Sequence, residues 1–154
     1  TPTLGICLGH QLASVALGGE VGRSESGRTV GVFTVDGGTA LADDELLAVT
    51  AGAPVAQWND DIVTGLPSGA TALATNERGD LLLARLAPTV WGVQGHPEAD
   101  REIIGRWADK DLDSPGLAGL DIAAALASIE AAQPAVDAAW RPAVTAFARL
   151  LHAG

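Results

Sequence analysis

One cysteine, one histidine and one glutamate stand where they could form a catalytic triad. Cys7 is the only cysteine of the 154-residue chain and lies within residues 5–11, GICLGHQ. Far downstream, residues 93–98, VQGHPE, place His96 and Glu98 two positions apart. A cysteine can attack a carbonyl carbon, a histidine can move the protons, and a carboxylate can orient the histidine. These residues predict covalent catalysis by a Cys-His-Glu triad.

The residues around Cys7 predict a sharp turn between a strand and a helix. Gly5 and Gly9 flank the cysteine in a Gly-x-Cys-x-Gly pattern, which has the spacing of the nucleophile elbow of hydrolases. The following helix N-terminus would favour a thiolate, and the N–H of Leu8 could face an oxyanion. The alternative is a small buried core cysteine, but the paired glycines and the downstream His-Pro-Glu favour a nucleophile.

His96 is the predicted base of the triad. Residues two apart on an extended segment point the same way, so Glu98 can reach the ring of His96. The alternative is a surface histidine beside an acid that caps a helix. His10 is the rival base, but we expect it to be structural, and His152 to lie in a solvated tail. Three histidines scattered in this way do not have metal-ligand spacing, so no metal or cofactor is expected.

Composition narrows the class of protein. Hydrophobic residues make up 47% and charged residues 18%, which predicts one globular domain with a packed core. A lone cysteine cannot form an internal disulfide and fits a reducing cytoplasm. The sequence has no apolar run long enough for a membrane span, and we expect no secretion leader. The net charge of −10 argues against general nucleic-acid binding.

Hydrophobic patterning predicts alternating elements with many strands in the middle of the chain. The predicted strands are residues 4–7, 28–35, 54–58, 70–75, 81–87 and 90–94. The predicted helices are residues 11–17, 43–49 and 100–110, followed by two helices within about 117–154 that Pro134 separates. Residues 36–38 are expected to form a turn, and 59–61 a loop. Because only three residues precede the first strand, we expect the later part of a larger domain.

Residues 5–11 and 91–98 resemble the class I, triad-type glutamine amidotransferases. Residues 27–31 and 58–70 are similar to the middle segment of that family, nearest to stand-alone members related to the amidotransferase domain of GMP synthase. The resemblance spans most of residues 3–100. It implies a flavodoxin-like α/β fold, with an open, mostly parallel sheet, flanking helices and a few antiparallel strands.

The resemblance also implies an activity. Cys7 would attack the side-chain amide of glutamine, a γ-glutamyl thioester would form, and ammonia would pass to a synthetase that aminates an acceptor. By the same carry-over, Gln11 would contact the substrate, the Leu8 N–H would supply half of the oxyanion hole, and Trp58, Asn59 and Asp60 would help to hold glutamine.

Two departures from the family pattern leave alternatives open. Relatives commonly read Trp-His-Gly-Asp where residues 58–61 read WNDD, which motivates a cysteine hydrolase of another γ-glutamyl or amide substrate. Nothing here matches the early strands and glycine-rich loop that supply the second oxyanion donor in the family. That difference motivates an inactive fragment with a structural or regulatory role. Residues 117–154 carry no motif and are expected to pack on the sheet.

Overall fold

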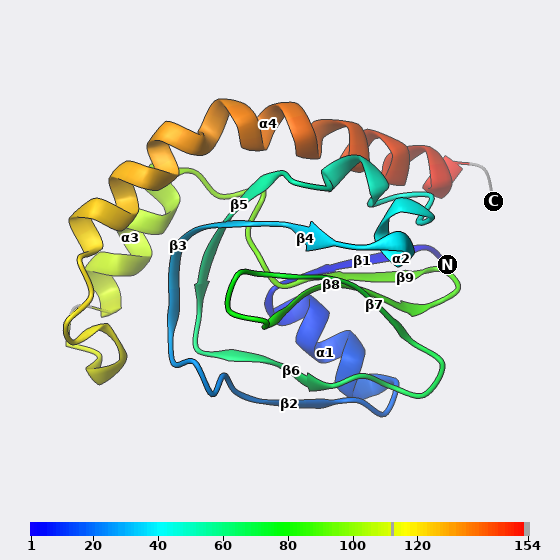
Figure 1. Cartoon of the computed structure of the whole chain (residues 1–154), viewed down its shortest axis with the longest axis horizontal. Helices are drawn as coiled ribbons and strands as arrows, with labels where there is room; N and C mark the ends of the chain where they lie inside the picture. Colours follow the sequence, from blue (N-terminus) through cyan, green and yellow to red (C-terminus); the bar gives the residue numbers. More distant parts are fainter. Residues whose placement is uncertain (112, 153–154) are drawn as a thin grey trace.

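The computed structural model describes residues 1–111 and 113–152 (Figure 1). Its α-helices are α1 (Leu8–Ala16), α2 (Thr39–Ala42), α3 (Arg101–Asp111) and α4 (Ile122–His152), with short 3-10 helices η1 (Ala48–Thr50) and η2 (Pro115–Leu117). Its strands are β1 (Thr3–Ile6), β2 (Glu20–Arg23), β3 (Thr29–Thr34), β4 (Asp36–Gly37), β5 (Pro54–Asn59), β6 (Asp61–Gly65), β7 (Thr71–Thr75), β8 (Leu81–Ala87) and β9 (Val90–Val93). None of the helices within these residues has the length and apolarity that a bilayer span requires.

A five-stranded mixed sheet forms the centre of the molecule, in the order β1-β9-β8-β7-β4. The pairs β2–β6 and β3–β5 form two smaller antiparallel ladders. The predicted α/β fold with flanking helices is confirmed, but the expectation of a mostly parallel sheet is wrong, because the sheet is mixed and most of its pairs are antiparallel. Among the described strands, parallel pairing is confined to β1 and β9, because short turns connect β7, β8 and β9 and such turns join only antiparallel neighbours.

Alternation along β9 directs its two faces toward different helices. The side chains of Trp91 and Val93 are buried in a core that includes Trp140 of α4. Gly92 between them faces the ring of His10 on α1. Helices α1 and α4 therefore cover opposite faces of the central sheet, as Figure 1 shows.

The predicted break at Pro134 is wrong, because α4 runs without interruption over 31 residues. A proline inside a helix costs about 3 kcal/mol. Burial on both sides of Pro134 offsets this cost, since Ile129 precedes it and Val136 and Trp140 follow it in the cores. The indole N–H of Trp140 also donates to the carbonyl of Pro54, at 3.0 Å. The predicted packing of the C-terminal segment against the sheet is confirmed.

Three local predictions are wrong. Residues 43–49 form turns that end in η1 instead of a helix, because the Asp44 carboxylate accepts the N–H groups of Leu46 and Leu47 and so replaces helical bonds. Residues 36–37 form β4 on the edge of the sheet, not a turn. The expected loop 59–61 is mostly strand, since β5 and β6 continue to positions 59 and 61 through pairing with β3 and β2.

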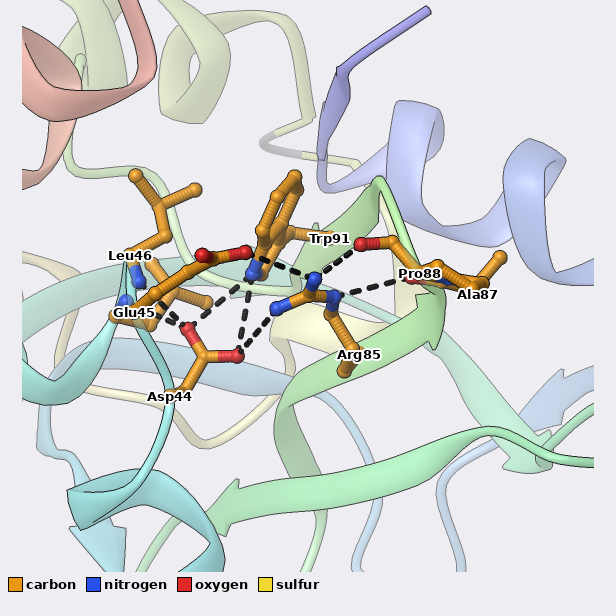
Figure 2. A network of polar contacts seen from close by, with 8 residues as sticks. Asp44, Glu45, Leu46, Arg85, Ala87, Pro88 and Trp91 are labelled. Carbon is orange, nitrogen blue, oxygen red and sulfur yellow. Dashed lines mark hydrogen bonds and ion pairs between the residues drawn. The ribbon is translucent and has the colours of Figure 1, made fainter. Parts of the chain in front are cut away.

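A buried ion pair fastens the segment after α2 to the central sheet. Figure 2 shows Asp44 beside Leu46, Trp91 and Arg85. Its carboxylate accepts hydrogen bonds from the N–H groups of Leu46 and Leu47, the indole N–H of Trp91 and the guanidinium of Arg85. The Arg85–Asp44 distance is 3.1 Å, and the Asp44 side chain is only 3% exposed. Arg85 also stacks over Trp91, 4.0 Å from the ring centroid.

We expect Asp44→Ala to lower the free energy of unfolding by about 3–5 kcal/mol, because it leaves a partly buried guanidinium and several N–H groups without their acceptor. Glu45→Ala is the matched control. Its carboxylate pairs with the same arginine but is 61% exposed, so its loss should cost less than about 1 kcal/mol. Urea denaturation measures both values, and equal losses would contradict this role of Asp44.

Candidate active site

Cys7 lies at a strained turn between β1 and α1. Its φ of 46° is the only positive value outside glycine in the described part of the chain, and such strain is typical of functional positions. The Cys7 N–H donates to the carbonyl of Val93 at 2.7 Å, and its own carbonyl accepts the N–H of Gln11 at 3.0 Å. The predicted strand-to-helix turn is confirmed, with the helix beginning at Leu8.

The two glycines of the turn differ in what surrounds them. A Cβ on Gly5 would lie 2.6 Å from the backbone of Gly9, whereas a Cβ on Gly9 would meet nothing within 4 Å. The close approach of strand and helix therefore depends on Gly5. Leu8 begins α1, so its N–H belongs to the first turn, whose donors have no partner within the helix. That N–H is suited to the predicted oxyanion role.

His96 and Glu98 meet as the sequence predicts. The Nδ1 of His96 lies 2.7 Å from Oε1 of Glu98. The backbone N–H of His96 donates to the carbonyl of Ala56 at 2.7 Å. The ring of Trp107 meets the imidazole edge to face, with centroids 4.8 Å apart. These contacts hold a largely buried imidazole in one orientation.

The surroundings of His96 favour its protonated form. Burial lowers the pKa of His96, but hydrogen bonds to Cys7 and Glu98 and the charges of both groups raise it more, to about 9. The side chain is therefore an imidazolium at neutral pH, placed between a sulfur and a carboxylate. An imidazolium beside a cysteine favours thiolate, which is the reactive form.

Gln94 is a site residue that the sequence reasoning missed. Its side chain is fully buried, and its Nε2 donates to the Sγ of Cys7 at 3.5 Å. Its Oε1 accepts a hydrogen bond from Gln11 at 3.4 Å. The available signal was a glutamine placed directly after an apolar strand and two residues before His96.

Gln11 joins this group from the first turns of α1. Its Nε2 donates to the carbonyl of Asp61 at 2.7 Å as well as to Gln94. Gln11 therefore lies one hydrogen bond away from the residue that contacts the sulfur. This placement fits the predicted substrate contact, which remains a prediction.

The three residues predicted to hold substrate at the end of β5 have other partners. The indole of Trp58 donates to Asp111 at 3.1 Å. Asn59 is buried and accepts a hydrogen bond from Gln57 at 3.3 Å. Asp60 pairs with Arg23 at 3.0 Å and with Arg28 at 3.5 Å. Two guanidinium groups therefore offset the negative charge that Asp60 brings to this segment.

His10 behaves as a structural residue, as expected. It is fully buried, and a Cβ on Gly92 would collide with its ring. Burial lowers the pKa of His10 to about 4, so the ring is neutral at physiological pH. Within residues 1–111 and 113–152, no three His, Cys, Asp or Glu side chains converge as metal ligands would.

Comparisons with known proteins agree with this geometry. The model of the family "Glutamine amidotransferase class-I" matches residues 1–106. Gamma-glutamyl peptidase 3 of Arabidopsis thaliana is 30% identical over 85% of this chain and 54% of its own length. One subunit of the glutamine-hydrolysing GMP synthase of Sulfolobus acidocaldarius is 36% identical over 63% of this chain and 50% of its own. The chain thus spans about half the length of these curated relatives.

Solved structures extend the comparison beyond residue 106. A glutamine amidotransferase from Thermotoga maritima superposes with a TM-score of 0.79 at 25% identity, over 95% of this chain and 62% of that one. The superposition therefore includes most of the C-terminal helices as well as the elements that carry Cys7 and His96.

We expect Glu98→Gln to lower the pKa of His96 from about 9, because the substitution removes the carboxylate charge that stabilises the imidazolium. The raised pKa means that protonated His96 stabilises the fold fully below about pH 6.5, and that this stabilisation is lost as the pH rises through about 9. NMR titration of the imidazole Cε1–H measures the midpoint. An unchanged midpoint in the variant would contradict the assigned pairing.

We expect Gln94→Met to shift the rate of Cys7 alkylation downward by about tenfold, since the hydrogen bond to the sulfur is lost. The rate of reaction with iodoacetamide between pH 5 and 10 measures it. Gln57→Met is the matched control, because Gln57 is also fully buried but bonds to Asn59 and Asn76. A similar shift in both variants would show a general loss of packing instead.

Proposed function

Because the chain belongs to the class-I glutamine amidotransferase family, we propose that it hydrolyses the side-chain amide of glutamine through a thioester on Cys7. The observation that carries the proposal is the position of His96, whose Nδ1 lies 2.7 Å from Glu98 and whose pKa is raised by the neighbouring Cys7 as well as by Glu98. A nucleophile, a proton donor and an orienting carboxylate are then in one chain of contacts.

The proposed reaction has two steps, formation of the thioester and its hydrolysis, and His96 transfers a proton in each. The thiolate of Cys7 attacks the amide carbon, and the Leu8 N–H donates to the oxyanion that forms. His96 gives its proton to the leaving nitrogen, and ammonia departs from the γ-glutamyl thioester. His96 then takes a proton from water, which attacks the thioester and releases glutamate. Glu98 keeps the imidazole oriented throughout, and Gln11 is the proposed contact for the substrate.

Two relatives support a proposal for the fate of the ammonia. The GMP synthase relative is one subunit of its enzyme, and a Streptomyces griseus relative, 35% identical over 64% of this chain, is an aminodeoxychorismate synthase. We propose that this chain likewise delivers ammonia to a synthetase that aminates an acceptor. A site that depends on a lone free thiol suits the reducing cytoplasm, which is the proposed compartment.

A second candidate is the hydrolysis of another γ-glutamyl amide. The match to the gamma-glutamyl peptidase covers 85% of this chain, and the altered residues 59–60 lie in the segment that would hold the substrate. The chemistry at Cys7 would be unchanged, with an amine in place of ammonia as the leaving group. A non-catalytic, structural or regulatory role is the remaining hypothesis.

Labelling with a glutamine-like diazoketone tests these proposals without a synthetase partner. We expect one adduct on Cys7 by intact mass and peptide mapping, blocked by excess glutamine. Cys7→Ala should give no adduct. His96→Gln should slow labelling by about 10²–10⁴-fold, the range for loss of a positioned acid or base.

The other outcomes separate the alternatives. An adduct that γ-glutamyl dipeptides block and glutamine does not would favour the second candidate. A chain that binds glutamine but gives no adduct and releases no glutamate would favour a non-catalytic role.

A further inference from the structure

A cavity of about 320 Å³ adjoins His96, between β5 and α3. Its walls are His96, the indoles of Trp58 and Trp107, and the side chains of Lys110 and Asp111. Hydrolysis of glutamine itself requires no such space, because the leaving group is ammonia.

The two charged residues of the cavity, Asp111 and Lys110, differ in whether they have an ion-pair partner. The Asp111 carboxylate accepts hydrogen bonds from Trp58 and Arg28, and these bonds lower the pKa of Asp111. Its charge is therefore matched by Arg28, whose side chain is only 7% exposed. Lys110 forms no ion pair with a carboxylate of residues 1–111 or 113–152. The cavity thus offers two aromatic surfaces and one available cation.

The geometry of amide cleavage determines which part of a substrate reaches this cavity. When Cys7 attacks the amide carbon, the leaving nitrogen must face His96 to receive its proton. If Gln11 contacts the substrate as proposed, the acyl half would lie toward Gln11 and the carbonyl of Asp61, which hydrogen bond to each other beside Gln94. Atoms attached to the leaving nitrogen then continue past the imidazole, where the cavity lies.

We propose that the cavity is a subsite for the amine half of γ-glutamyl peptides whose second residue is apolar or aromatic. Trp58 and Trp107 contact that side chain, and the ammonium of Lys110 pairs with the free carboxylate. The proposal rests on the Cys7 chemistry described above. The Sγ–C bond forms, the C–N bond breaks, and the His96 proton goes to the departing amino group. Water then gives a proton to His96 and attacks the thioester, which releases glutamate and restores the thiolate.

Binding to the Cys7→Ala chain tests the subsite without turnover. The probes are γ-glutamyl-phenylalanine, its C-terminal amide, γ-glutamyl-glycine and glutamine. We expect the phenylalanine dipeptide to shift the indole N–H signals of Trp58 and Trp107 and to bind about tenfold more tightly than the glycine dipeptide, from burial of the ring. It should bind about fivefold more tightly than its amide, the upper range for an exposed ion pair.

Two variants distinguish a specific role of Lys110 from the general effect of removing a positive charge from helix α3. Lys110→Gln should abolish the preference for the free carboxylate over the amide. Arg106→Gln should keep it, because Arg106 is an exposed cation of the same helix that pairs with Glu102 instead. Equal binding of dipeptide and amide in the unaltered cavity, or unshifted indoles at saturation, would overturn the subsite.

The same probes distinguish this failure from failure of the proposed function. If glutamine blocks labelling of Cys7 while the dipeptides bind no better than glutamine and leave the indoles unshifted, the subsite is wrong and glutamine hydrolysis stands. If neither glutamine nor any dipeptide binds, and Cys7 does not react with the diazoketone, both proposals are wrong.

Discussion

The parallel pairing of β1 with β9 is the constraint on which the site depends. Its register places Ile6 opposite Val93, and the Cys7 N–H continues the ladder to the Val93 carbonyl. The elbow and the His-Pro-Glu segment are thereby brought to one edge of the sheet, although almost ninety residues separate them. A shift of one residue would turn the side chains of β9 to the opposite faces. Trp91 would then leave its core, and the space that His10 occupies beside Gly92 would be lost.

The polar groups around the sulfur of Cys7 are of three kinds: a charged side chain, a neutral side chain and backbone N–H groups. His96 carries charge, Gln94 donates a neutral hydrogen bond, and the first turn of α1 presents backbone N–H groups. Together they place hydrogen-bond donors around the proposed nucleophile. Gln94 has the further effect of tying the sulfur to Gln11, so that the nucleophile and the proposed substrate contact are held by one buried amide.

Local sequence patterns predicted the candidate catalytic residues better than they predicted the helices. Gly5 and Cys7 could be interpreted from spacing alone, because the turn needs a small residue two positions before the nucleophile. His96 and Glu98 are neighbours in sequence, so their contact is also local. The continuity of α4 through Pro134 could not be predicted, since it depends on burial of Trp140 and Val136 against distant strands. Gln94 was missed for the same reason, because its partners come from α1.

Arg28 links the two halves of the proposed substrate site. Its nearly buried guanidinium pairs with Asp60, beside the segment proposed to hold the acyl half, and with Asp111, in the wall of the cavity beyond His96. The same group lies over the ring of Trp58, 5.2 Å from its centroid. A buried cation between two carboxylates is stable only while both partners remain in place. The aspartate at position 60 is therefore part of the support of Trp58, and Arg28 connects the two sides of the proposed substrate site.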